Sequence, residues 1–467
     1  MNEKNKNPKL PLDPETAAKS GQTHYLAQVT NPETNETLRV LRPIFIENSK
    51  KSEDGVRVVP AYLYQFFNLT EKIVYLRNNA LGTEIRYIYK KGVYKPSADN
   101  DVRKIMLDYI EAYKYKLQSE IWAVDTARQL LDSKSPYIDH DSMNADESVI
   151  NFQNGILNLF SMQFKPHTPE LLSTIQIPCD WTGKQTPTPI FDRFIETLTS
   201  GDKSSAKLLL QYMGAVISNI DGAKFKKALF LVGDGNTGKS RISSILRRIL
   251  GKENTSERSL KRLSERFGET AVYMKRLIFS SDLSFMKIDQ MDRFKELTGG
   301  DTISVEFKNR EPFDYRFKGL LLFSMNQLPR FGGDRGNHVY DRMLIIKCGQ
   351  TIPEHLRDPC LEDKLFDERE GIIFKCVTAL LPVIANGCRF DVPEECKINI
   401  EEYKEQNSSV IEFWNECSEP CADGESCVNN SQLFYSCFVI WSKERGLHYI
   451  SSFSEFRQEV SAYVGKP

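Results

Sequence analysis

The chain contains 467 residues, of which 40% are hydrophobic and 27% are charged, a composition typical of folded globular proteins. Because single hydrophobic cores rarely grow beyond about 250–300 residues, we expect two to four domains. The 62 basic and 63 acidic side chains nearly cancel, which excludes a global basic field, so any contact with nucleic acid must use local patches.

The sequence predicts no membrane contact. Its first ten residues, MNEKNKNPKL, are polar and lack the apolar segment of a signal peptide, and no apolar run reaches the length of a membrane span. Nine of the ten cysteines lie at or after Cys348 without a CxxC pair. This pattern favours reduced thiols in a cytoplasm over a disulfide framework or a zinc site.

Residues 1–22 are rich in Asn, Lys and Pro, and we expect them to form a mobile tail. Residues 23–135 predict an α+β region that begins with strand-like patterns. Its clearest hairpin has Ile85–Tyr89 and Val93–Tyr94 on either side of Lys90-Lys91-Gly92. Helical periodicity follows from about residue 101 to residue 131.

Residues 136–223 predict a second hairpin followed by helices. Val149–Phe152 and Ile156–Leu159 flank Gln153-Asn154-Gly155, whose Asn-Gly pair is a strong turn signal. Helical patterns return over residues 189–198 and 208–217. We expect these helices to form a collar before the next domain.

A glycine-rich loop in the middle of the chain predicts a nucleotide site. It matches the pattern G-x-x-x-x-G-K-S and consists of Gly233, Asp234, Gly235, Asn236, Thr237, Gly238, Lys239 and Ser240. An apolar run, Ala228–Val232, precedes the loop, and helical spacing follows it up to Gly251. Backbone N–H groups and the dipole at a helix N-terminus favour phosphate. We therefore expect ATP here, with Lys239 at its outer phosphates and Ser240 on Mg²⁺.

Residues 224–350 predict a parallel sheet flanked by helices, because further apolar runs recur at Leu277–Phe279, Leu320–Phe323 and Met343–Ile346. Ligands of such sheets bind at the carboxyl ends of the strands. There, Asp282 stands where a Walker B acid is expected, and Asn326 where an amide can sense the γ-phosphate.

The role of Asp282 has two solutions, because Ser281 occupies the position where a second acid is usual. In the first, which we favour, Asp282 is the catalytic base and Ser240 carries the Mg²⁺. In the second, Asp282 holds the metal and another acid is the base.

Two arginines could complete the site of a neighbouring subunit by stabilising charge on the phosphoryl group in transfer. Arg342, which opens the last apolar run, is our first choice, and Arg335 in the preceding Gly-rich loop is the second. A surface salt bridge is the alternative for both.

A charged hairpin is predicted over residues 301–313, with Lys308, Asn309 and Arg310 near its tip. In a ring of subunits, these side chains could follow a nucleic-acid backbone through a central pore. A solvated turn is the alternative.

The remainder of the chain predicts a helical lid over residues 351–400 and a C-terminal module over residues 401–467. The module's helical patterns cover Ile398–Gln406, Ser409–Cys417, Ser431–Arg445 and Phe453–Val464. With a short strand around His448–Ile450, this order suits a winged-helix-like DNA-binding module, and a plain helical bundle is the alternative. The sequence stops at Pro467, about where a wing would begin, so we expect truncation there.

These motifs together resemble the superfamily 3 helicases, which are AAA+-type hexameric DNA motors. The motifs that carry the resemblance occur in that superfamily's order: Gly233–Ser240, Asp282, Lys295–Asp301, Asn326 and Arg342. More narrowly, the chain is similar to the poxvirus-type primase-helicases of phages and plasmids. Phe152–Leu157 and Pro166–Pro169 resemble that family's helicase-associated segment, and Val410–Trp414 and Leu433–Trp441 resemble its C-terminal extension. The layout is most like the replication initiator helicases of staphylococcal mobile genetic elements.

The resemblance implies a multidomain α/β protein with a central AAA+-like P-loop ATPase, an N-terminal α+β region and a helical collar. It implies a homo-hexameric replicative DNA helicase in the bacterial cytoplasm that uses ATP and Mg²⁺ on single-stranded and forked DNA. Host or element-encoded replication proteins would be further partners. Two other functions stay open: a bifunctional primase-helicase, although the first 100 residues lack a primase signature, and a non-motor, ATP-switched origin-binding or loader protein.

Overall fold

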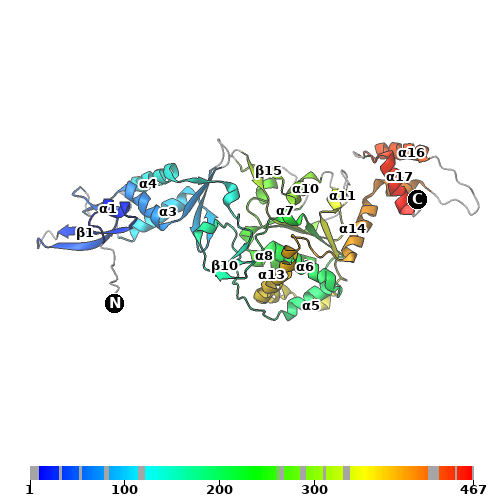
Figure 1. Ribbon diagram of the computed structural model, residues 1–467, viewed down its shortest axis with the longest axis horizontal. Coiled ribbons are helices and arrows are strands. Elements are labelled where there is room, and N and C mark those ends of the chain that lie inside the picture. Colours follow the sequence, from blue (N-terminus) through cyan, green and yellow to red (C-terminus); the bar gives the residue numbers. More distant parts are fainter. Residues whose placement is uncertain are drawn as a thin grey trace, which may run out of the picture. The chain divides into compact units, whose positions relative to one another are not determined.

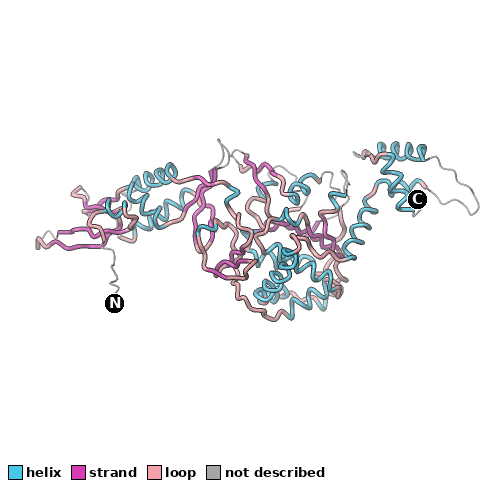
Figure 2. Tube along the Cα trace, viewed as in Figure 1, coloured by secondary structure: helices cyan, strands magenta, loops and turns pink. Residues whose placement is uncertain are grey.

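The structure is a computed structural model with two compact units. It describes residues 10–30, 34–51, 55–77, 84–113, 121–259, 262, 268–283, 291–308, 312–329, 337–418, 431–447 and 450–464. Unit 1 comprises Met1–Ala145 and Thr168–Thr174, and unit 2 comprises Asp146–His167 and Ile175–Pro467. Both units contain helices and strands (Figure 2), so the chain is a multidomain α/β protein.

Unit 1 is built from small sheets and helices. Its elements are α1 (Pro14–Lys19), β1 (His24–Thr30), β2 (Thr37–Pro43), β3 (Ile46–Asn48), β4 (Val56–Val58), α2 (Pro60–Thr70), β5 (Ile73–Arg77), β6 (Glu84–Lys90), β7 (Val93–Pro96), α3 (Asp99–Glu111), α4 (Ile121–Lys134) and β8 (Tyr137–Ile138). The predicted hairpin is confirmed as β6–β7, in which Lys90 pairs with Val93. Lys91 and Gly92 both have positive φ, which matches the strand twist in two-residue turns.

Two sequence predictions in unit 1 are wrong. Within the expected mobile tail, residues 14–19 form α1, which Asp13 caps through its side chain and whose Ala17 is fully buried. Within the strand-like region, residues 60–70 form α2, which buries Leu63, Phe66 and Phe67. In both cases a proline starts the helix and packing against the core of unit 1 stabilises it, so contacts distant in sequence overrode the local pattern.

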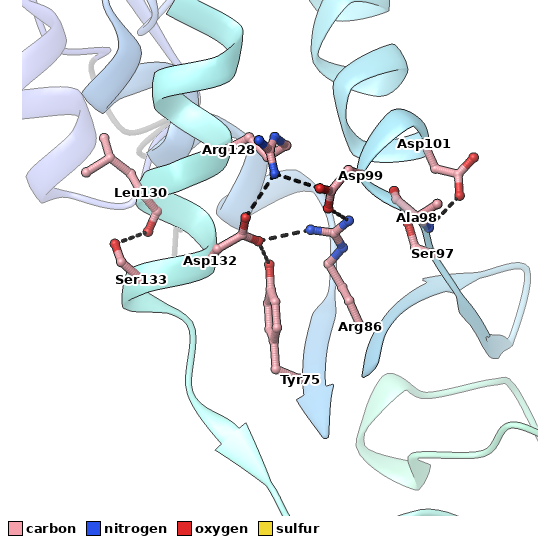
Figure 3. Close-up of polar contacts among 10 residues, drawn as sticks. All are labelled: Tyr75, Arg86, Ser97, Ala98, Asp99, Asp101, Arg128, Leu130, Asp132 and Ser133. Carbon is pink, nitrogen blue, oxygen red and sulfur yellow. Dashed lines mark hydrogen bonds and ion pairs between the residues drawn. The ribbon is translucent and has the colours of Figure 1, made fainter. Parts of the chain in front are cut away.

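A network of charges joins three elements of unit 1 (Figure 3). The guanidinium of Arg86 on β6 bonds to Asp99 at 2.8 Å and to Asp132 at 2.9 Å, and Arg128 contacts the same two carboxylates. Tyr75 donates to Asp132 at 2.7 Å. Burial, together with this bond, raises the pKa of Tyr75. The two arginines and two aspartates neutralise each other, so this network ties β6 to α3 and α4.

Unit 2 begins with the second predicted hairpin, which is confirmed. Its strands are β9 (Val149–Phe152), β10 (Gly155–Asn158) and β11 (Phe164–Lys165), and Phe152 pairs with Gly155. An added Cβ on Gly155 would lie 2.6 Å from the Lys165 carbonyl oxygen, so this position requires glycine. The hairpin packs into the core of unit 2 through Ile150, Phe152 and Leu157.

The centre of unit 2 is a five-stranded sheet of parallel strands in the order β13-β14-β17-β12-β18. The strands are β12 (Ala228–Val232), β13 (Thr255–Glu257), β14 (Leu277–Leu283), β17 (Leu320–Met325) and β18 (Met343–Lys347). All four predicted apolar runs are strands of this sheet. The fifth strand, β13, is short and polar, so it carries no apolar signal.

Each face of the sheet buries alternate residues of its strands, as period-two geometry requires. Leu229 and Leu231 face a core shared with α5 (Pro189–Leu198), α6 (Lys203–Ile217), α8 (Lys239–Leu250), α12 (Leu361–Asp367) and α13 (Arg369–Ala385). Phe230 faces a second core with α10 (Asp292–Gly299), β15 (Thr302–Val305) and β16 (Phe313–Arg316). Figure 1 shows α6 and α13 on one side of the sheet and α10 on the other.

Two short helices and one long helix complete this region: α7 (Gly222–Phe225), α11 (Asn337–Tyr340) and α14 (Glu394–Asn407). The predicted boundary at residues 223/224 falls inside α7, and the boundary at 400/401 falls inside α14. Helices cross both boundaries because packing, and not local composition, determines where these elements end.

The last part of the chain has a small aromatic core of its own. Three helices, α15 (Ser409–Cys417), α16 (Ser431–Glu444) and α17 (Phe453–Val464), pack around Phe413, Phe438 and Phe456. His448 and Tyr449 of the predicted strand lie outside the described residues, so that strand and the winged-helix-like assignment stay predictions. Among the described helices, none combines the length and apolarity needed to cross a bilayer.

Candidate nucleotide site

The loop Gly233–Ser240 connects β12 directly to α8, as the sequence predicts. Asn236 and Gly238 have φ values of 61° and 97°, which curl the loop back toward the start of the helix. Gly238 is the N-cap residue of α8 and provides no side-chain cap for its first turn. The N-terminus of a helix is a position that suits a phosphate, because backbone N–H groups and the helix dipole point there.

Two glycines of the loop lie in close contact with their neighbours. A Cβ on Gly233 would lie 3.1 Å from the carbonyl oxygen of Cys348, and a Cβ on Gly238 would lie 3.0 Å from the ring of Phe194. Gly235 has open space around it. Strand β18 and helix α5 therefore hold the two ends of the loop, whereas its middle is exposed.

Lys239 lies folded into the loop that precedes it. Its Nζ donates to the carbonyl oxygens of Gly233 and Asp234, both at 2.6 Å, and lies 3.2 Å from Thr237 Oγ1. Lys239 and Thr237 are buried, while Ser240 is exposed at the first turn of α8. The loop thus places an ammonium group and a hydroxyl beside the same helix N-terminus, an arrangement that fits a phosphate and a hard cation.

The strand register brings Asn326 to the same edge of the sheet. Val232 pairs with Met325, and the N–H of Gly233 donates to the Met325 carbonyl oxygen at 3.2 Å. Asn326, which follows Met325, is exposed there. The backbone of Asp282 also lies at this edge, within β14. The pairing of β14 with β17 shifts by one residue between Ser280 and Leu283, a bulge that sequence reasoning missed.

The segment after β18, at Thr351 and Ile352, forms hydrogen bonds with the outer side of the loop. Sequence reasoning missed this segment as well. Thr351 Oγ1 donates to the Gly235 carbonyl oxygen at 2.9 Å, and the N–H of Ile352 donates to the Asn236 carbonyl oxygen at 3.1 Å. These two bonds satisfy carbonyl groups in the exposed middle of the loop. No local pattern marks Thr351, because only the parallel return of β18 beside β12 brings it there.

Cys348 is the other neighbour of the loop. Its N–H donates to the Val232 carbonyl oxygen at 2.6 Å. Burial raises the pKa of the Cys348 thiol to about 12, against the opposing effect of the nearby Lys239 ammonium. At neutral pH this side chain is therefore an uncharged part of the loop's support.

Arg342 lies at the opposite edge of the sheet. Its carbonyl oxygen accepts from the N–H of Ala228, the first residue of β12, whereas the loop follows the last residue of β12. Five residues at about 3.3 Å each separate the two ends by roughly 16 Å. Arg342 therefore does not reach the loop of its own subunit. Its Nη1 donates to the carbonyl oxygen of His338 at 2.5 Å.

The predicted charged hairpin is present as β15 and β16, in which Val305 pairs with Phe313. Phe307 stacks on Phe313 with ring centroids 5.8 Å apart, and Tyr273 packs edge-on against Phe307 at 5.4 Å. Lys308 is exposed in the connecting turn. Asn309 and Arg310, as well as Arg335 elsewhere, lie outside the described residues, so their roles stay predictions.

Two family matches fall on separate segments of the chain. Residues 231–342 match a family of unknown function (DUF5906). This segment runs from β12 to Arg342 and contains the four residues for which the sequence predicts a catalytic role. Residues 73–200 match a family described as "D5 N terminal like". That segment runs from β5 to the end of α5 and includes the hairpin β9–β10.

Among curated proteins, the "Putative helicase 184R" of Invertebrate iridescent virus 6 is 22% identical to this chain over 344 residues. The aligned part covers 65% of this chain and 35% of the viral protein, so the chain spans about a third of that relative's length. Two apo structures of the NrS-1 C-terminal region are similar in fold at 14% identity. Their TM-scores are 0.49 and 0.47, and the matches cover 75% and 73% of this chain and 76% and 74% of those chains.

Proposed function

We propose that this protein is an ATP-dependent replicative DNA helicase that acts as a hexamer. The observation that carries the proposal is the carboxyl edge of the central sheet, where the adjacent strands β12, β17 and β14 end and the loop with Lys239 follows the first and Asn326 the second. The similarity to a viral protein named as a helicase supports the same function. We also propose that the protein is one of the replication initiator helicases of staphylococcal mobile genetic elements and that it acts in the bacterial cytoplasm.

Within one subunit, the loop Gly233–Ser240 would hold the phosphates of ATP, and Lys239 would contact the outer ones. Ser240 and Asp282 would hold Mg²⁺, which supplies charge neutralisation to the phosphates when it is bound. Asn326 would orient the attacking water beside the γ-phosphate. In the division of roles that we favour, Asp282 accepts the proton of that water.

The position of Arg342 supports a site that is shared between subunits. Because Arg342 and the loop lie at opposite edges of one sheet, each subunit can offer a loop to one neighbour and an arginine to the other. Head-to-tail contacts of this kind close into a ring when the rotation fits. A ring would also bring the hairpins with Lys308, Asn309 and Arg310 around single-stranded or forked DNA.

Replacement of one lysine tests the proposal. Lys239→Ala should abolish ATP hydrolysis stimulated by single-stranded DNA and strand displacement on a forked duplex, because the outer phosphates lose their cation. Lys252→Ala is the matched control, since Lys252 is exposed just beyond α8. If Lys239→Ala retains both activities, the proposal is wrong. ATP binding and assembly of the wild-type protein without strand displacement would instead establish an ATP-switched origin-binding or loader protein.

The ring is tested by particle mass with and without ATP and DNA. A sixfold mass is expected, whether or not ligands are required for assembly. A monomer under all conditions would contradict the shared site even if ATP is hydrolysed.

A further inference from the structure

Helix α14 carries a stripe of polar side chains that the proposed function does not use. Cys396, Asn399, Tyr403 and Asn407 follow one another at intervals of three or four residues and so share one face of the helix. All four are buried. Buried polar groups of this kind are retained only where they find partners, and here each contacts the ATPase core.

The first two residues of the stripe hold α14 against the edge of the sheet. The N–H of Ile345 donates to Cys396 Sγ at 3.2 Å, and Asn399 Nδ2 donates to the Ile345 carbonyl oxygen at 3.2 Å. Strand β18 is the last strand of its sheet, so α14 satisfies backbone groups on its outer edge. This half of the stripe fixes the helix to Ile345 in the middle of β18, beyond Arg342 in the chain.

The other two residues reach those segments. Tyr403 donates its hydroxyl to the carbonyl oxygen of Pro329, three residues after Asn326. Asn407 Nδ2 donates to the hydroxyl oxygen of Tyr340 at 2.9 Å, and Tyr340 lies two residues before Arg342.

The contacts between these side chains leave little freedom for separate movement. The rings of Tyr340 and Tyr403 pack edge-to-face with centroids 5.7 Å apart, and both residues are 3% exposed. In such an apolar surrounding, hydrogen bonds are strengthened and unpaired polar atoms are costly, so the set holds one arrangement. One helix therefore holds the segment after Asn326, which serves the subunit's own ATP, and the segment before Arg342, which serves the neighbour's ATP.

We propose that Tyr403 and Asn407 are positioning residues that set Asn326 and Arg342 for hydrolysis at two adjacent ATP sites of the ring. This inference rests on the proposed function. The same helix leads into the C-terminal module: Ser408 caps α15 and bonds to Glu459 of α17 at 2.6 Å. Movement of that module thus acts on both ATP sites through one helix.

Two asparagines of the stripe provide a matched test. Asn407→Ala should lower kcat for DNA-stimulated ATP hydrolysis about fivefold, the effect of one lost hydrogen bond, with KM for ATP unchanged because the loop is intact. Asn399→Ala removes an equally buried amide from the same helix face but only at the sheet edge, so kcat should stay at the wild-type value. Equal losses of kcat in both variants would overturn the proposal.

Double variants test whether Asn407 acts through Arg342 and whether Tyr403 acts through Asn326. On an Arg342→Ala background, Asn407→Ala should change kcat by less than about twofold, because its target is already removed. Tyr403→Phe, which keeps the ring and deletes only the hydroxyl, should likewise have no further effect on an Asn326→Ala background. Tyr25→Phe is the control, since Tyr25 donates a buried hydroxyl to the Ile46 carbonyl oxygen in unit 1. Additive losses in both double variants would overturn the proposal.

Failure of the inference differs from failure of the proposed function. If the wild-type protein shows no ATP hydrolysis stimulated by DNA, the proposed function is wrong and the inference falls with it. If the wild-type protein is active and Arg342→Ala is impaired while Asn407→Ala and Tyr403→Phe are not, only the positioning role is wrong.

Discussion

The two edges of the central sheet use their polar groups in different ways. At the carboxyl edge, the middle of the loop Gly233–Ser240 and Asn326 are exposed, and Thr351 supports the loop from outside. At the amino edge, Arg316 contacts Asp221 at 2.9 Å, and Asp221 caps α7. The first edge exposes polar groups to solvent, and the second joins helices to the sheet.

Two arginines at the amino edge differ in burial, although each directly precedes a strand of the sheet. Arg276 precedes β14, is 2% exposed and donates to the carbonyl oxygens of Ala215, Val216 and Lys318 at 2.5–3.1 Å. Arg342 precedes β18 and is only half-buried.

The partners explain why a charge tolerates complete burial. Ala215 and Val216 belong to the last turn of α6, where the negative end of the helix dipole favours a cation. Burial lowers the pKa of Arg276 to about 10, against the attraction of Asp221, so the side chain stays charged at neutral pH. The comparison indicates that Arg276 stabilises the fold, whereas Arg342 is the arginine to which we assign a role in the proposed function.

Loss of Arg342 should give the largest effect. Arg342→Ala should lower ATP turnover by ~10³-fold or more, as for other arginines that act on a phosphoryl group in transfer. The midpoint of thermal unfolding should stay close to that of the wild-type protein, because this side chain is half-buried and bonds to one carbonyl group of its own segment. Turnover is measured with saturating DNA. Unchanged turnover would make Arg342 a structural residue like Arg276.

Loss of Arg276 should affect stability instead. Arg276→Met leaves three buried carbonyl groups without their donor, so the free energy of unfolding should fall by about 3 kcal/mol or more. Urea unfolding measures this value. Arg316→Met is the control at the same edge: the Arg316 side chain is 47% exposed, and its buried partner Asp221 still accepts from the N–H of Ala223, so the loss should be smaller than for Arg276→Met. If both variants unfold alike, burial does not distinguish the arginines of this edge.

The smallest expected effect is on the pH dependence of stability, through Cys348, which supports the loop at the carboxyl edge. Because burial raises the pKa of Cys348 from 9.0 to about 12, the folded state binds its proton more tightly than the unfolded state. The resulting stabilisation is complete below pH 9.0 and is lost as pH rises toward about 12.

Alkylation of the native protein tests whether the pKa of the Cys348 thiol is raised. Exposed Cys360 should react with iodoacetamide at pH 8, whereas Cys348 should not. Equal labelling of the two thiols would show that the fold does not raise the pKa of Cys348.

The sequence predicted the features that depend on neighbouring residues. The four apolar runs, both hairpins and the turn from β12 into α8 follow from side-chain alternation, from Asn-Gly and Lys-Gly turns and from glycines at special φ values. Asn326 was predicted at the edge of the loop because parallel strands end together, and the register of β12 with β17 places it there. Its role in hydrolysis stays a prediction.

Other features escaped sequence reasoning for a physical reason. Tyr403 and Asn407 occur in a charged helix with only weak apolar periodicity, and their partners lie more than sixty residues earlier in the chain. The hydrogen bond from Thr351 to the loop and the bulge near Asp282 likewise depend on which strands become neighbours.

The sequence by itself therefore specifies a phosphate-binding loop between a strand and a helix, because close residues dictate backbone conformation and turn chemistry. It does not distinguish Arg276 from Arg342, since both occur as an arginine before an apolar strand. Packing separates them: the end of α6 meets β14 and buries one arginine among carbonyl groups, while β18 leaves the other half-exposed at the edge of the sheet. Burial and partners depend on the whole fold, so the structural role of Arg276 became evident only from the tertiary structure.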